Sequence, residues 1–256
     1  MGSEFEIEIR CVYGKLKEGH VHICVRGHME NRMFFRQVWW LLRKDLLLEW
    51  RSRDRLTMMF FFVVVSLGIF GLSLRVDPSI QREILAGVLW SILAFAGTLG
   101  MNQLYAAERE DEGLEGLRMA PVPKEALFLA KQGALMLFLF LCAMWAVPLA
   151  SVMFGVSLSS FVLSAVPIFL LGMWGFSIIG TLMATLLLNA RFRDALLPLL
   201  FLPVALPVVI AGAQATNELI GQAGIPHTSF WIRGLAFFDI FFLVVGLWLF
   251  RFQFEQ

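Results

Sequence analysis

Histidine and cysteine are the residues of this sequence whose types could bind a metal or form redox pairs. His20, His22 and Cys24 could supply three metal ligands, but a structural zinc site needs four. Cys11, Cys24 and Cys142 form no C-x-x-C pair and no C-x-x-C-H motif. We therefore predict no metal site, no disulfide framework and no covalently bound cofactor, and we expect Cys142 to be a packed thiol.

Carboxylates and arginines are concentrated in one segment, residues 107–123. Leu114 and Leu117 give this segment a small apolar face, and Pro121 and Pro123 should end its helix before the next apolar run. Such a segment can be a docking element, because its charges orient a partner and its leucines fill a groove. The alternative is a solvated connection that is charged because it lies in water.

Asp239 is the clearest ionisable residue within an apolar run, where a charge is costly. It lies about eight residues into the last run, roughly 12 Å from the start of that run at about 1.5 Å per residue. We interpret it as a polar group that faces the interior of a helix bundle and ties its helix to a neighbour. The alternatives are a position shallow enough to reach outer water, and a direct role in transport or gating.

The composition indicates which elements must position these residues. Of the 256 residues, 59% are hydrophobic and 16% are charged, whereas soluble domains have roughly 45–50% apolar and about 25% charged residues. A soluble fold could not cover so much apolar surface, so we predict an all-α polytopic membrane protein. Its six transmembrane helices, each about 20 residues long, are expected near 56–74, 84–105, 125–151, 161–188, 195–213 and 231–251. Three prolines, Pro198, Pro203 and Pro207, predict a bent or broken fifth span.

An amphipathic segment, residues 33–55, precedes the first predicted span. Apolar and aromatic residues recur in it at helical spacing, which predicts a basic helix in the membrane interface; the alternative is a surface helix packed on the bundle. Its cationic residues are Arg36, Arg43, Lys44, Arg51, Arg53 and Arg55. Residues 1–32 are polar and lack the apolar core of a signal peptide. We interpret them as an N-terminal extension that is disordered or not native to the protein.

The distribution of Lys and Arg predicts the orientation, because cytoplasmic flanks of membrane helices carry an excess of these residues. With the N-terminus inside, twelve of them lie in inner flanks and three in outer flanks. The inner set is Arg36, Arg43, Lys44, Arg51, Arg53, Arg55, Arg109, Arg118, Lys124, Arg191, Arg193 and Arg251, and the outer set is Arg75, Arg82 and Arg233. Both termini are therefore predicted to be cytoplasmic. Lys131, just inside the third span, is expected to extend its ammonium back to the inner surface.

Two stretches of the sequence resemble a known family. The residues of the charged segment that match the first cytoplasmic loop of type-2 ABC exporter membrane subunits are Glu108, Arg109, Glu110, Gly113, Leu114, Glu115, Leu117 and Pro121. Residues 113–122, and the proline-containing stretch 191–211, are similar to the haem exporter protein B family, the CcmB-type permeases of cytochrome c maturation. The resemblance covers about residues 33–256.

The resemblance implies a non-catalytic permease subunit of a bacterial inner membrane. A separate cytoplasmic ABC ATPase would hold the ATP, consistent with the lack of a G-x-x-x-x-G-K-[ST] loop here. The matching loop residues would couple that ATPase to the membrane. The other implied partners are a haem-handling membrane protein, a small membrane subunit and a periplasmic haem chaperone, with haem as the transported or presented ligand. The permease would pair with a second copy or with a different membrane subunit, in contact with lipid and without nucleic acid.

Other interpretations stay open. A type-2 ABC permease for a drug, a lipid or a glycan would carry the same loop. A membrane scaffold or assembly factor could recruit partners through the loop and move nothing. His227, in a segment predicted to be an outer loop, could ligate haem iron, although a lone loop histidine is usually solvated. An enzyme is disfavoured, because polar residues in the apolar runs form no His/Ser/Asp constellation.

Overall fold

The computed structural model describes residues 23–73, 78–104, 123–155, 162–187, 190, 192–220 and 225–253. Within these ranges the regular structure is entirely α-helical. The helices are α2 (Ile23–Ser52), α3 (Asp54–Ser73), α4 (Pro78–Asn102), α7 (Lys124–Phe154), α8 (Val162–Leu186), α9 (Arg193–Ile220) and α10 (Ile225–Gln253). The predicted all-α class is confirmed.

Six of the described helices are long and apolar enough to cross a membrane, as predicted. Their apolar segments are Arg55–Ser73, Ile84–Asn102, Glu125–Phe154, Ser164–Leu186, Arg193–Ile220 and Ser229–Leu249. The fifth continues to Ile220, past the predicted end at 213, because Ala, Gln, Glu and Leu in its last turns are good helix formers. With α10 starting at Ile225, most of the segment expected to be an outer loop is helical.

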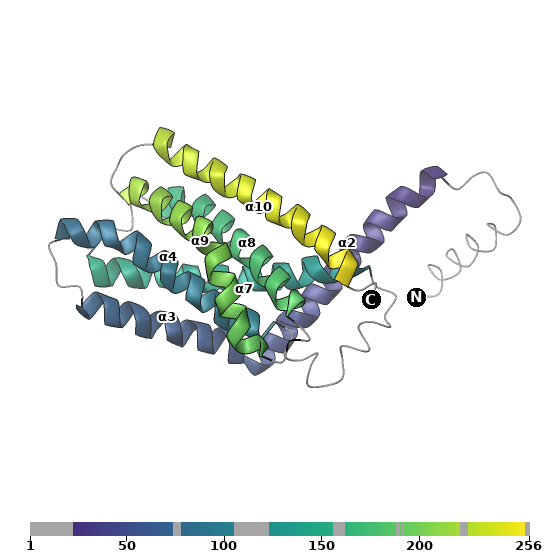
Figure 1. Cartoon of the computed structure of the whole chain (residues 1–256), viewed down its shortest axis with the longest axis horizontal. Coiled ribbons are helices and arrows are strands. Elements are labelled where there is room, and N and C mark those ends of the chain that lie inside the picture. The colour runs from purple at the N-terminus through teal and green to yellow at the C-terminus, as the bar shows by residue number, and fades with distance from the viewer. Residues whose placement is uncertain are drawn as a thin grey trace, which may run out of the picture.

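The six spans form one bundle, whose long axis is horizontal in Figure 1. The spans of α4 and α8 have the largest buried share, and those of α3 and α10 have the smallest. α4 contacts α3, α7, α8 and α9, and α8 contacts α4, α7, α9 and α10. α4 and α8 are therefore the central helices, while α3 and α10 present most of their apolar surface outward, to lipid in a membrane.

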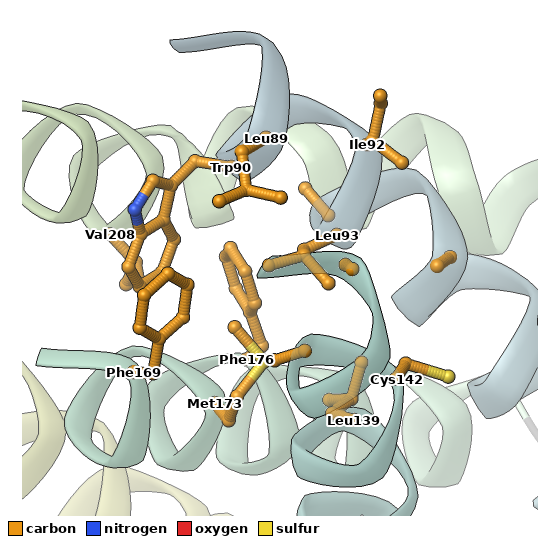
Figure 2. Packing of buried hydrophobic residues seen from close by; sticks show 14 of the residues in the cluster. Leu89, Trp90, Ile92, Leu93, Leu139, Cys142, Phe169, Met173, Phe176 and Val208 are labelled. Atoms are coloured by element: carbon orange, nitrogen blue, oxygen red, sulfur yellow. The ribbon is translucent and has the colours of Figure 1, made fainter. Parts of the chain in front are cut away.

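The indole of Trp90 fills the space between α4, α8 and α9, and Figure 2 shows it beside Phe169. The two rings stack with centroids 5.2 Å apart, and Trp90 Nε1–H donates to Thr216 Oγ1 at 3.0 Å. A Cβ atom at Gly172 of α8 or at Gly212 of α9 would overlap the indole. These two glycines therefore let α8 and α9 approach α4 closely around the fully buried Trp90. Cys142 packs in the same core as a buried free thiol.

α2 differs from the predicted interfacial helix, 33–55, in both bounds. It begins at Ile23 and ends at Ser52. Residues 23–32 contain no proline, so the backbone can stay helical there. Arg53 separates α2 from α3, because its φ of 58° is left-handed, and its N–H donates to Glu49 O at 2.6 Å. α2 runs obliquely to the other helices (Figure 1) and packs against α7 and α3.

α9 is continuous although it contains Pro198, Pro203 and Pro207. Its buried residues recur every three or four positions and so form one packed face, which contacts α4, α8 and α10. Pro203 and Pro207 are exposed, away from that face. Of the two predicted outcomes, the broken helix is wrong: α9 runs without a break, and its packing on three neighbours supports the backbone despite the missing donors.

Candidate functional site

The predicted docking residues Glu108, Arg109, Glu110, Gly113, Leu114, Glu115, Leu117 and Pro121 lie outside the described residues. Both flanks of their segment are described. α4 ends at Asn102 and continues as a turn through Leu104, and α7 begins at Lys124 directly after Pro123. We call this end of the bundle, where α4 ends and α7 begins, the loop end. The contacts that hold the loop end determine how movement of the segment between α4 and α7 can reach the spans.

Three cationic side chains from three helices donate to backbone carbonyls at the end of α4. The pairs are Arg55 of α3 with Gln103 O at 2.9 Å, Lys131 of α7 with Leu104 O at 3.1 Å, and Arg193 of α9 with Met101 O at 3.5 Å. Carbonyls at a helix C-terminus lack intrahelical partners and carry partial negative charge. We call Arg55, Lys131 and Arg193 the α4 clamp, because together they fix the last turn of this central helix.

Two carboxylates of α2 pair with two of the clamp cations. Lys131 Nζ lies 3.2 Å from Asp45 Oδ2, and Arg55 Nε lies 3.4 Å from Glu49 Oε2. Glu49 Oε1 also accepts the Leu56 N–H at 2.9 Å, which fixes the turn between α2 and α3. These four charged side chains have little contact with solvent. Loss of one member would leave its buried partner with less compensation, and in buried ion pairs such a loss costs up to about 3–5 kcal/mol.

The clamp joins five helices at one point. Arg55 lies over the Phe138 ring of α7, 4.9 Å from its centroid, in addition to its contacts with α2 and α4. Arg193 is buried at the start of α9. Any movement of the 105–122 segment that displaces the last turn of α4 would therefore act on α2, α3, α7 and α9 together.

Two basic residues lie elsewhere than expected. The expectation that Lys131 reaches the inner surface is wrong: it is buried and turns toward Asp45, because this carboxylate and the Leu104 carbonyl satisfy its ammonium inside the bundle. Arg55, assigned to the basic interfacial helix, belongs to α3, and its side chain is only 12% exposed in the clamp. Of the other residues in that basic set, Arg36, Arg43, Lys44 and Arg53 are exposed, and the side chain of Arg51 is not described.

Sequence reasoning missed Asp45 and Glu49 as members of this site. A signal was present, because residues four apart share one helix face, and Leu42 and Leu46 of the same face pack on the core. Carboxylates within a buried stripe predict buried partners. The partner Lys131 is 86 positions from Asp45, so spacing alone could not identify it.

Asp239 lies midway along the sixth span, ten residues from Ser229 (239 − 229) and ten from Leu249 (249 − 239). It is 2% exposed and faces α8, where its Oδ1 packs against Gly175. This burial does not fit a position that reaches outer water. Among the described residues, neither carboxylate oxygen has a hydrogen-bond partner, so the expected polar tie to a neighbouring helix is not formed within that part of the chain.

The possible metal ligands His20, His22 and Cys24, and the possible haem ligand His227, have side chains outside the described ones. His20 and His22 precede the described residues, whereas the backbones of Cys24 and His227 belong to α2 and α10. Within the part of the chain that the structure describes, no group of three His, Cys, Asp or Glu residues could hold a metal ion.

The sequence similarity of this chain to known proteins includes the loop end. Residues 36–249 match the family described as CcmB protein, and this range contains the clamp and both carboxylates of α2. The chain is 34% identical to Heme exporter protein B of Rhodobacter capsulatus over 184 residues, which are 70% of this chain and 81% of that protein. It is 27% identical to the protein of the same name from Pseudomonas aeruginosa, over 76% of this chain and 86% of that protein. The corresponding Paracoccus denitrificans protein is 29% identical, over 72% and 83%.

Proposed function

The chain belongs to the CcmB protein family, and from this premise we propose that it is the membrane subunit of an ABC-type haem exporter in cytochrome c maturation. The observation that carries the proposal is the 34% identity to a protein named Heme exporter protein B, over 81% of its length. Six apolar helices able to cross a membrane agree with a multi-pass transport subunit. We assign it to a bacterial inner membrane, with the loop end and both termini on the cytoplasmic side.

A separate cytoplasmic ABC ATPase would dock on the segment that contains Glu108 and Glu115. The α4 clamp supports this part of the proposal, because Leu104, the last described residue before that segment, is itself held by Lys131. A push on the segment would reach the central helix α4 through one turn of chain. The ATPase would thereby act on the spans although this subunit carries no nucleotide-binding loop.

Haem would be presented or transported by the complex and not held by a fixed histidine ligand in these spans, since no span contains a histidine. The remaining partners in the proposal are a haem-handling membrane protein, a small membrane subunit and a periplasmic haem chaperone. ATP hydrolysis would release the haem-loaded chaperone.

Complementation tests the proposal. In a bacterium that lacks its own protein of this family, the wild-type chain should restore holocytochrome c, measured by haem staining. Glu108→Lys and Glu115→Lys should lower both the cytochrome yield and the amount of co-purified ATPase at an unchanged level of membrane-inserted protein. Arg233→Glu, an exposed charge reversal at the opposite end of the bundle, should leave both unchanged.

Two outcomes would contradict separate parts of the proposal. Charge-reversed chains that retain the ATPase and full cytochrome yield would rule out docking at this segment. A wild-type chain that inserts and recruits an ATPase but restores no cytochrome c would favour a permease for another substrate.

A further inference from the structure

The charges of α2 are segregated between its two faces. Among its described side chains, both carboxylates point into the bundle, with Asp45 7% and Glu49 5% exposed. Three cations, Arg36, Arg43 and Lys44, are exposed. The carboxylates are paired with Lys131 and Arg55 of the clamp, so they compensate charges inside the bundle. The outward face is therefore positive, and its charge complements a negative surface.

The same outward face exposes large apolar side chains. Trp39 is 60% exposed and Trp40 is 54% exposed, and Phe35 and Leu47 are exposed beside them. The guanidinium of Arg43 lies 5.5 Å from the centroid of the Trp40 ring. Tryptophan rings reside at the depth of lipid headgroups, where adjacent cations can meet phosphate groups. The chemistry of this face is that of a boundary between acyl chains and anionic headgroups.

We propose that the outward face of α2 binds anionic phospholipid headgroups in preference to zwitterionic ones. Phe35, Trp39 and Trp40 enter the boundary of the bilayer, and Arg36, Arg43 and Lys44 contact the headgroup phosphates. Each such cation strengthens binding to an anionic membrane by about fivefold. The inference is independent of the haem assignment, because it uses only α2 and the membrane location of the bundle.

Lys44 connects this lipid surface to the clamp. Its Nζ lies 3.5 Å from Asp45 Oδ1, and Asp45 also accepts a hydrogen bond from Lys131 Nζ at 3.3 Å. The two ammonium groups thus share one carboxylate. The lipid-facing cation Lys44 is therefore one carboxylate away from Lys131, which holds the end of α4.

Quenching of tryptophan fluorescence by brominated lipids tests the proposal on the full chain in vesicles. The signal of Trp39 and Trp40 is the difference between the wild type and the W39F/W40F variant. Brominated phosphatidylglycerol should quench this signal at least twofold more than brominated phosphatidylcholine at equal mole fraction, and high salt should remove the preference. In the triple variant R36Q/R43Q/K44Q, both brominated lipids should quench this fluorescence equally.

Matched controls separate lipid charge from other effects. R36K/R43K keeps the charges and should keep the preference, whereas R233Q removes an exposed cation at the opposite end of the bundle and should change nothing. Equal quenching of the wild type by both lipids overturns the proposal. Absence of quenching by either lipid means that a protein covers this face, which also overturns it. Loss of the preference in excess inorganic phosphate would show a site for free phosphate instead of a lipid headgroup.

Discussion

The central helix α4 is held in two places by different kinds of contact. Around Trp90 the contacts are steric and almost entirely apolar, between an indole, a stacked phenyl ring and two glycines. At the loop end the contacts are electrostatic, between three cations and three carbonyls. Close packing admits one arrangement, whereas hydrogen-bonded charges can exchange partners when a new partner comes within reach.

This difference shows where α4 can move. Trp90 is twelve residues before Asn102, or roughly 18 Å along the axis at about 1.5 Å per residue. If the Trp90 contacts stay fixed, a small tilt of α4 about them displaces the loop end while the core keeps its packing. The following substitutions test this division between a fixed and a movable region.

Removal of the fixed contact should have the largest effect. Trp90→Ala should lower the free energy of unfolding in detergent by about 3 kcal/mol, since it leaves a large cavity among three helices. We expect the lower part of the range known for soluble cores, because the exposed chain in a membrane is already in an apolar solvent. Thermal unfolding followed by near-UV circular dichroism measures the loss. Trp145→Ala, at an exposed position, should change stability little.

Removal of one clamp cation should cause the second-largest loss of stability. Lys131→Met leaves Asp45 without its buried partner, and we expect a loss of about 2–3 kcal/mol. The loss stays below the upper range for such pairs because Lys44 lies 3.5 Å from Asp45 and compensates part of its charge. The double variant D45N/K131M should recover most of the stability in the same unfolding assay. No recovery would show that the ion pair is not the cause.

A methyl group added beside the indole should cost less. Gly172→Ala puts a Cβ into the space of the Trp90 ring, and overpacking of this kind costs about 1–3 kcal/mol. Gly87→Ala on α4 is the matched control, because a Cβ there has no neighbour within 4 Å. The control should be neutral or slightly stabilising, since alanine favours a helix over glycine. Equal melting temperatures of the two variants would contradict close packing at Gly172.

The smallest effect is expected from loss of the hydrogen bond that the Trp90 indole donates in the fixed region. Thr216→Val keeps the shape of the side chain but removes the acceptor of the Trp90 indole N–H, at a cost of about 1 kcal/mol. Thr216→Ser restores an acceptor and should recover most of the loss. The tryptophan emission maximum should shift in the valine variant and return in the serine variant, which a general loss of packing would not produce.

Hydropathy predicted the six spans because each is a local property of about 20 consecutive residues. The helix bounds that the sequence did not predict correctly depend on tertiary contacts. Arg53 ends α2 although it is neither glycine nor proline, and the carboxylate of Glu49 completes that turn by accepting the Leu56 N–H. A continuous α9 required knowledge of the three helices that support it.

The candidate site was only partly predictable for the same reason. The charged segment before Lys124 is visible in the sequence, but the clamp that holds its flank brings together residues 86 and 92 positions apart. Charge patterns assigned Arg55 and Lys131 to the membrane surface, because the rule for basic residues counts positions and ignores partners. The carboxylates that retain both cations inside the bundle lie on a helix that precedes all six spans.

The spacing between Asp45 and Lys131 also sets an order of events during synthesis. At about 5–20 residues per second, a ribosome needs roughly 4–17 s to add the 86 residues between them. During this interval Asp45 has been made while the partner of its carboxylate does not yet exist. The chain can therefore complete its loop end only after α7 has been made.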